Sequence, residues 1–253
     1  MNIFSSLKSP RPENIFRPMK ILRRLTREYS KSYNVIEEVT LPWGLKMRVR
    51  PYETIGSCIW RLGIDDLCVS ESIWRLLDAV ECSVDIGSNI GHMTSVIGTR
   101  VGQTGKVIAF EPHPWIYKEL NVNVRNWAKL SGMGKIITQN IALSDHCGDG
   151  LLNIPDDFEK NRGLATLISD NKKTGFNGRV CKVSLKTLGQ VIGKTGRIGV
   201  IKIDVEGHEL EVLKGGAQLI NGHAFRDIIF EQTGQFHTPI TEFLKKKDII
   251  YFI

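Results

Sequence analysis

Hydrophobic and polar residues alternate with a period of two in the first regular stretch of the chain. In residues 45–50, LKMRVR, apolar side chains take every second position and basic side chains take the others. This period is typical of a half-exposed strand. Pro42 and Gly44 stand just before it, and we expect them to form the turn of a hairpin within residues 34–51.

Residues 70–81, SESIWRLLDAVE, have the period of a helix instead. Four apolar side chains fall on one helical face, namely Ile73, Leu76, Leu77 and Val80. Ser70 or Ser72 stands where a polar side chain would cap the first turn. We therefore expect a helix whose apolar face packs on the rest of the protein.

From residue 82 onward, short apolar runs alternate with helical patterns. The expected strands are residues 82–87, 105–112, 135–145, 198–207, 227–234 and 249–253, and the expected helices are residues 91–101, 115–130, 208–220 and 239–247. Such alternation implies a mostly parallel sheet with helices on both faces. The sequence therefore predicts a doubly wound α/β domain of the Rossmann-like kind.

One section interrupts this alternation. Residues 145–188 are rich in Gly and Asn and contain short alternating pieces, which predict an antiparallel flap inserted between the third and fourth core strands. We expect residues 1–81 to form a basic arm, a hairpin and helices that pack on the core. Residues 82–253 would form the ligand-binding domain.

Length and composition support a single substantial core. The chain has 253 residues, of which 42% are hydrophobic. It contains neither the run of roughly 18 apolar residues that a membrane span needs nor the apolar core of a secretory signal. We expect a cytoplasmic protein. Its five cysteines are widely spaced and predict reduced thiols rather than a zinc site.

The charge is concentrated at the start of the chain. Residues 1–31 carry a net charge of +6 out of the total of +7, so the rest is close to neutral. Four apolar or aromatic residues in this segment recur at steps of three and four positions, namely Met19, Leu22, Leu25 and Tyr29. This spacing predicts a short amphipathic helix there. A basic arm can bind phosphates, so a nucleic-acid-binding protein or an RNA methyltransferase stays an alternative. The near-neutral body favours a protein that does not bind nucleic acid.

The turn DIGSNIG, residues 85–91, follows the first core strand. In doubly wound folds, ligands bind outside the carboxyl ends of the strands. We expect Gly87 to let the backbone approach a ligand, and Gly91 to let the next helix begin close to the strand. Asn89 stands where a dinucleotide motif would have its second glycine. A nicotinamide-dependent oxidoreductase is therefore a weaker alternative.

The next two strand ends also carry polar groups. Glu111, with Pro112 after it, closes the second strand, and its carboxylate can accept hydrogen bonds from both hydroxyls of a ribose. The third strand ends with residues that could surround an adenine, namely Asn140, Ala142, Ser144 and Asp145. Three neighbouring strand ends would then bind one adenosine, and S-adenosylmethionine is the ligand that this arrangement favours.

Four stretches, VDIGSNIGHMT, VIAFEPHP, NIALSD and IKIDVEGHELEVLKGG, resemble the FkbM family of S-adenosylmethionine-dependent methyltransferases. The resemblance runs from about residue 41 to residue 234. It implies a class I methyltransferase fold and methyl transfer, usually to an oxygen. It also implies that the turn residues line the methionine part of the cofactor, namely Asp85, Gly87, Asn89 and Gly91. Glu111 would bind the ribose, and residues 140–145 would lie beside the adenine.

The fourth strand carries the candidate catalytic groups. A period of two sends Lys202, Asp204 and Glu206 to one face of a strand that is otherwise apolar. Buried charges require partners or a function. An acceptor alcohol needs a base, for which Asp204 and His208 are the candidates, with Glu206 orienting a partner.

The acceptor that we expect is a small molecule or glycan, such as the hydroxyl of a sugar, a glycolipid or a polyketide. A divalent metal could be held by three carboxylates, namely Asp204, Glu206 and Glu231. Methyl transfer from a sulfonium requires positioning of the acceptor and a base, and we expect no metal.

Overall fold

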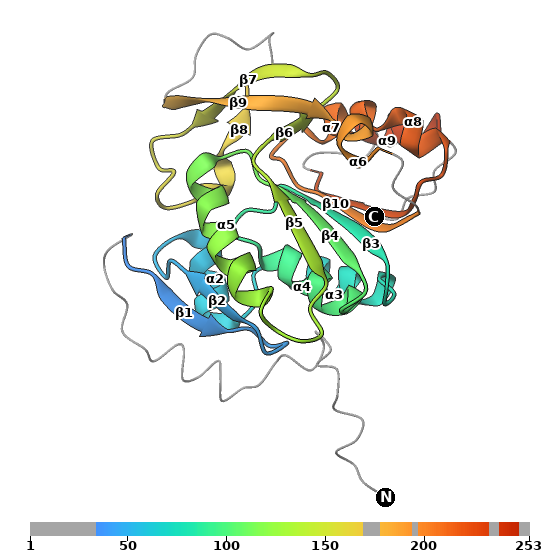
Figure 1. The fold of residues 1–253 in the computed structure, drawn as a ribbon. Coiled ribbons are helices and arrows are strands. Elements are labelled where there is room, and N and C mark those ends of the chain that lie inside the picture. The colour runs from blue at the N-terminus through green and yellow to red at the C-terminus, as the bar shows by residue number, and fades with distance from the viewer. Residues whose placement is uncertain (1–33, 169–177, 194–196, 233–237, 248–253) are drawn as a thin grey trace, which may run out of the picture.

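The computed structural model describes residues 34–168, 178–193, 197–232 and 238–247 (Figure 1). The basic arm of residues 1–31, with its expected amphipathic helix, lies outside the described residues. The expected last strand, residues 249–253, lies outside them as well. In the described part of the chain, no helix has both the length and the apolarity needed to cross a membrane.

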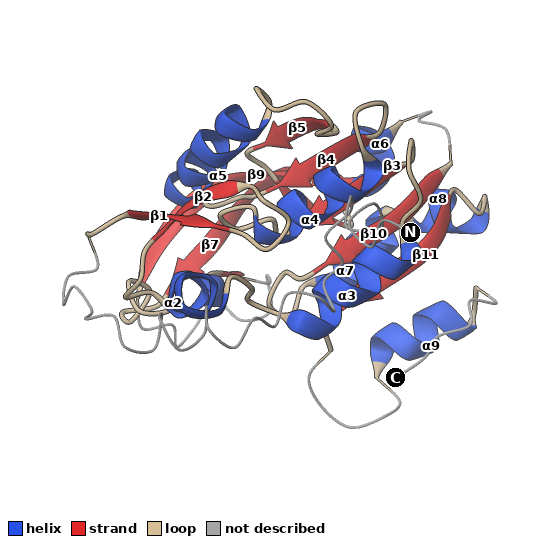
Figure 2. Cartoon of the chain, turned by 90° about the horizontal axis from the view of Figure 1, so that it is seen from below, coloured by secondary structure: helices blue, strands red, loops and turns tan. Residues whose placement is uncertain are grey.

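The core is a sheet of five parallel strands in the order β11-β10-β3-β4-β5, and Figure 2 shows them side by side. Their bounds are β3 Cys82–Ile86, β4 Lys106–Phe110, β5 Lys135–Gln139, β10 Ile198–Ile203 and β11 Phe225–Phe230. The strand order reverses between β3 and β10, where a ligand site is expected. The predicted doubly wound α/β fold is confirmed.

Helices cover both faces of this sheet. The hairpin and helices α2, α3, α4 and α5 pack against one face and form one hydrophobic cluster with it. The later helices pack against the other face and form a second hydrophobic cluster. The helices are α2 Thr54–Leu62, α3 Leu67–Leu76, α4 His92–Val101, α5 Pro114–Trp127, α6 Leu188–Ile192, α7 Glu209–Gly215, α8 Ala217–Asn221 and α9 Pro239–Lys245. The three central strands β3, β4 and β10 are therefore buried on both sides, which explains their apolar sequences.

The N-terminal hairpin forms as the alternating pattern predicts. Strand β1, Glu37–Thr40, pairs antiparallel with β2, Lys46–Val49. Side-chain hydrogen bonds attach β2 to α5. The indole Nε1 of Trp127 donates to the carbonyl of Lys46 at 2.7 Å, and the Asn123 amide both accepts from and donates to the backbone of Arg48. The hairpin therefore covers one face of the core.

The helix predicted over residues 70–81 begins and ends earlier than expected. Asp66, rather than Ser70 or Ser72, caps α3, because its carboxylate accepts a hydrogen bond from the Val69 N–H at 2.9 Å. Ser70 lies inside the helix, where its hydroxyl bonds to the backbone. Val80, expected on the buried face, is 66% exposed, because it follows the end of the helix and has a φ of +68°.

The single strand predicted over residues 135–145 is two strands in different sheets. After β5, the Asn140 side chain donates to the carbonyls of Glu111 and Pro112, and the chain turns away. Strand β6, Ala142–Ser144, then pairs with β9. The helix predicted over residues 208–220 is likewise divided at Gly216, where a Cβ would lie 2.8 Å from the Leu188 side chain.

The insertion forms a second sheet with the order β6-β9-β7-β8, which is at the top of Figure 1. Strands β7 Gly148–Ile154, β8 Thr166–Leu167 and β9 Arg179–Thr187 pair antiparallel, as predicted. A single 3₁₀ turn, η3 Arg162–Leu164, lies between β7 and β8. It contacts α2, so the insertion reaches across to the N-terminal part of the molecule.

The hydrogen bond between Trp127 and the hairpin should contribute to the free energy of unfolding. Trp127 is fully buried, so Trp127→Phe removes the donor to the Lys46 carbonyl and should lower the free energy of unfolding by about 1–3 kcal/mol. Trp115→Phe, at a side chain that is 52% exposed, should change it by less than about 0.5 kcal/mol. Urea denaturation followed by circular dichroism measures both, and equal losses would contradict this role of the indole.

Candidate cofactor and acceptor pocket

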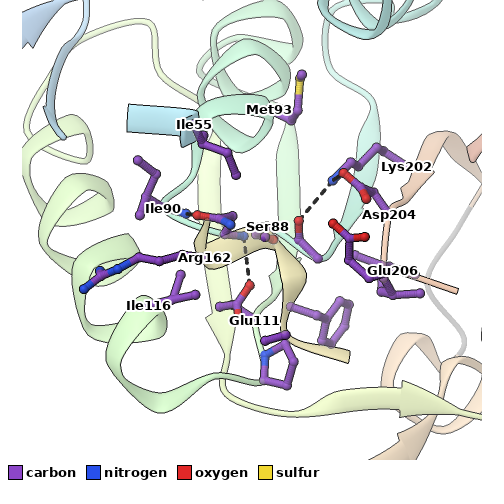
Figure 3. Close-up of a pocket in the computed structure, with 18 of the residues that line it drawn as sticks. Ile55, Ser88, Ile90, Met93, Glu111, Ile116, Arg162, Lys202, Asp204 and Glu206 are labelled. Atoms are coloured by element: carbon purple, nitrogen blue, oxygen red, sulfur yellow. Dashed lines mark hydrogen bonds and ion pairs between the residues drawn. The ribbon is translucent and has the colours of Figure 1, made fainter. Parts of the chain in front are cut away.

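A cavity of about 310 Å³ lies at the carboxyl ends of the parallel strands (Figure 3). Its lining comes from the ends of β3, β4, β10 and β11, from the loop between α2 and α3, and from the insertion. Seven of the residues predicted from the sequence line it, namely Gly87, Asn89, Glu111, Pro112, Ala142, Asp204 and Glu206. Six others lie outside its lining, namely Asp85, Gly91, Asn140, Ser144, Asp145 and His208.

Gly87 and Gly91 in the turn must be glycine because a side chain at either position would collide with another part of the protein. Gly87 has a φ of +76°, and a Cβ there would lie 1.8 Å from the backbone oxygen of Asp204. Gly91 has a φ of +98°, and its Cβ would lie 2.7 Å from Leu120. Gly87 therefore lets the ends of β3 and β10 approach each other, and Gly91 lets the start of α4 pack on α5. The sequence analysis explained Gly87 by the approach of a ligand and did not predict its contact with the backbone of Asp204.

Asp85 lies beneath the turn. Its side chain is fully buried, and its Oδ2 accepts a hydrogen bond from the Thr94 hydroxyl at 2.5 Å. Its Oδ1 lies 3.6 Å from the Nζ of Lys202, which also donates to the Gly87 carbonyl at 3.0 Å and pairs with Asp204 at 3.2 Å. Asp85 therefore supports the turn through Lys202.

Lys202 is nearly fully buried at the end of β10, on the strand next to Asp85. Burial alone would lower its pKa, but the neighbouring carboxylates Asp204 and Asp85 outweigh burial and raise the pKa above its ordinary value. The side chain therefore stays protonated, and its charge is shared between two acidic groups.

Glu111 is positioned by two backbone hydrogen bonds. Its Oε2 accepts from the Asn89 N–H at 2.9 Å, and its Oε1 accepts from the His113 N–H at 2.8 Å. Burial raises its pKa to about 7, and these two hydrogen bonds oppose that effect. Each carboxylate oxygen has two lone pairs, so each retains acceptor capacity toward the cavity.

Four further carboxyl groups line the opposite part of the cavity, namely Asp65, Asp204, Glu206 and Glu231. Glu206 has a φ of +55°, and its carbonyl accepts a hydrogen bond from the Thr166 hydroxyl at 2.9 Å. Partial burial and the neighbouring Asp204 and Glu231 raise the pKa of Glu206 to about 7. In the described residues, no cluster of three His, Cys, Asp or Glu side chains has an arrangement suited to a metal ion.

His208 lies beside the cavity rather than in its lining. Its Nε2 is 3.0 Å from the hydroxyl of Ser144, whose neighbour Asp145 also contacts that hydroxyl, and its Nδ1 is 3.8 Å from Glu211. Ser144 is fully buried. These groups therefore join β6 to α7, and the structure does not bring His208, Ser144 or Asp145 to the ligand space.

Several residues of the pocket lining were not predicted from the sequence, and Asp65 and Arg162 are two charged examples. Asp65 comes from the loop before α3, a segment in which the sequence analysis identified no candidate residue. Arg162 comes from η3 in the insertion, and its guanidinium pairs with Glu119 at 2.8 Å and with Glu159 at 3.2 Å. No local pattern marks Arg162, because its position depends on how the insertion folds back.

The sheet order, the glycine turn at the point where that order reverses, and the buried carboxylate at the next strand end together define a class I methyltransferase fold. Residues 85–251 match the family described as the Methyltransferase FkbM domain. The chain belongs to this family, and the resemblance found in the sequence is confirmed. The resemblance to this family implies S-adenosylmethionine as the cofactor.

Two curated proteins that are similar to this chain are described as methyltransferases. The hexuronic acid methyltransferase AglP of Haloferax volcanii is 34% identical over 165 residues, which are 62% of this chain and 59% of AglP. The methyltransferase sdnD of Sordaria araneosa is 33% identical over 159 residues, 52% of this chain and 59% of sdnD. The chain thus spans about three fifths of the length of each. The solved FkbM methyltransferase of Methylobacillus flagellatus is 14% identical, with a TM-score of 0.40, over 83% of this chain and 47% of that one.

The contact between Gly87 and Asp204 predicts a large effect of one methyl group. Gly87→Ala adds a Cβ that meets the Asp204 backbone, and it should lower the free energy of unfolding by about 3–5 kcal/mol or prevent folding. Gly132→Ala is a control, because Gly132 has a similar positive φ of +86° but no atom within 4 Å of its Cβ position. It should cost about 1–2 kcal/mol. Equal losses in urea denaturation would contradict the close approach.

Proposed function

We propose that the protein transfers the methyl group of S-adenosylmethionine to a hydroxyl of a small molecule or glycan, such as a sugar, a glycolipid or a polyketide. The observation that carries this proposal is the carboxyl of Glu111, held by the N–H groups of Asn89 and His113 inside the cavity. A carboxylate fixed in this way can accept both hydroxyls of a ribose. The sugar acceptor named for the relative AglP supports the acceptor class.

The residues of the cavity suit each part of this cofactor. Ile141, Ala142 and Leu143 form an apolar strip at one end, which suits an adenine ring. Glu111 follows on β4, and the turn of Gly87 follows on β3. Beyond them, the carboxylates at the ends of β10 and β11 suit a positively charged group. When bound, S-adenosylmethionine supplies a methyl group already activated by its sulfonium.

The protein must then position the acceptor and remove its proton. Positioning contributes about 7–11 kcal/mol in favourable cases. We assign the base to Glu206 in preference to the earlier candidates, because His208 is outside the cavity lining and Asp204 is paired with Lys202. A pKa of about 7 makes the Glu206 carboxylate basic enough to accept a proton near neutral pH. Asp204, held by Lys202, would orient the acceptor hydroxyl.

The insertion supports Glu206 from outside. The Thr166 hydroxyl bonds to the Glu206 carbonyl, and a Cβ at Gly163 would lie 3.4 Å from the Glu206 carboxyl oxygen. The segment that includes η3 therefore lies close against this carboxyl group. We propose that it limits the access of water to the acceptor and contributes to the choice of acceptor.

Glu111→Ala tests the ribose assignment. It should weaken S-adenosylmethionine binding by about 10- to 100-fold, because two hydrogen bonds to a charged acceptor are lost. Glu38→Ala, which removes an exposed carboxylate that pairs with Lys46, should leave the affinity unchanged. Isothermal titration measures both. An unchanged affinity in Glu111→Ala would contradict the assignment of the ribose to Glu111.

Glu206→Gln tests the base. The base is active only when it is ionised, so the turnover of the unmodified protein should rise with pH through about 7 and then level off. Glu206→Gln should lower turnover by about 10²- to 10⁴-fold and remove this rise. A labelled-methyl transfer assay over pH 5.5–9, with acceptors from a glycolipid and metabolite extract, measures both. A variant that keeps the rise would show that another group accepts the proton.

A further inference from the structure

Acidic side chains outnumber basic ones in the lining of the cavity. Its carboxyl groups are Asp65, Asp66, Glu111, Asp204, Glu206 and Glu231, and its basic side chains are Lys202 and Arg162. Four of the acids lie on the side opposite the adenine strip, and we call Asp65, Asp204, Glu206 and Glu231 the carboxylate wall. Figure 3 shows Asp204 and Glu206 on this side, with Arg162 across the cavity.

The two basic side chains neutralise only part of this wall. Lys202 divides its charge between Asp204 and Asp85, which lies outside the lining. Arg162 pairs with Glu119 and Glu159, which also lie outside the lining. His92 also lines the cavity, and it is neutral because burial lowers its pKa to about 3.

Three members of the wall have no ion-pair partner among the described residues, namely Asp65, Glu206 and Glu231. Burial, followed by repulsion from Glu53, raises the pKa of Asp65 to about 7, and partial burial with the nearby Asp204 raises the pKa of Glu231. These carboxyl groups therefore repel one another when they are ionised, and a cation placed among them would be stabilised.

The strand order places the wall next to the charged part of the proposed cofactor. The adenine strip follows β5, Glu111 follows β4 and the Gly87 turn follows β3, while Asp204 and Glu231 follow β10 and β11. Neighbouring strands lie about 4.8 Å apart. A nucleoside bound by its ribose at Glu111 therefore directs its 5′ substituent toward the wall.

We propose that the carboxylate wall selects the ligand by charge, holding the sulfonium of S-adenosylmethionine and releasing the uncharged thioether S-adenosylhomocysteine. This inference rests on the proposed function. The two ligands differ by one methyl group and one positive charge, so their shapes hardly distinguish them. Interactions between charges a few ångströms apart near a protein surface are strong enough to do so at low salt. The wall would thus favour exchange of product for fresh donor.

Binding measurements test the inference without an acceptor. Isothermal titration at low salt compares S-adenosylmethionine, S-adenosylhomocysteine and sinefungin, whose amine replaces the sulfonium and keeps a positive charge. The unmodified protein should bind the two cationic ligands at least about tenfold more tightly than S-adenosylhomocysteine. In the double variant Glu206→Gln/Glu231→Gln, this preference should fall by about tenfold, while S-adenosylhomocysteine binding changes little.

The control removes two carboxylates elsewhere. Glu38→Gln/Asp149→Asn neutralises two exposed side chains that pair with Lys46 and Lys182, and it should keep the preference. The substituted wall residues are exposed, so circular dichroism should show intact folding in both double variants. Equal or tighter binding of S-adenosylhomocysteine by the unmodified protein would overturn the inference, as would an unchanged preference in the wall variant. Failure of all three ligands to bind would instead overturn the proposed function.

Discussion

One buried ammonium group connects the two strand ends on which the pocket is built. Lys202 on β10 lies next to Asp85 on β3, and its Nζ reaches Asp85, Asp204 and the Gly87 carbonyl. A buried charge is stable only with such partners, and its removal would leave two acidic groups uncompensated. The shape of the glycine turn and the direction of the Asp204 side chain therefore both depend on this one residue.

Local patterns in the sequence predict most of the fold, because strand and helix periods are local properties. They fail where distant contacts decide. Residues 135–145 read as one strand, but Asn140 bonds to the end of β4 and sends the following residues into another sheet. Asp204 and Glu206 could be placed at a strand end by their period, whereas Arg162 could not, since its position depends on how the insertion folds.

The distribution of charge suits the chemistry that we propose. Methyl transfer removes the positive charge of the donor, and in the same reaction the acceptor hydroxyl loses a proton. If Glu206 takes that proton, the wall loses one negative charge as the ligand loses its positive one. The net charge inside the pocket then stays constant, so little rearrangement of the surrounding groups is required.

The two sides of the pocket differ in how they are constructed. The floor is formed by strand ends packed so tightly that even a methyl group at Gly87 does not fit. The opposite side comes from the insertion, which pairs mainly within its own sheet. Protein engineering can therefore vary the segment around Arg162 and Thr166, while the strand ends that we propose to bind the donor stay unchanged. Chimeras exchanged at this boundary are the natural route to altered methylation chemistry.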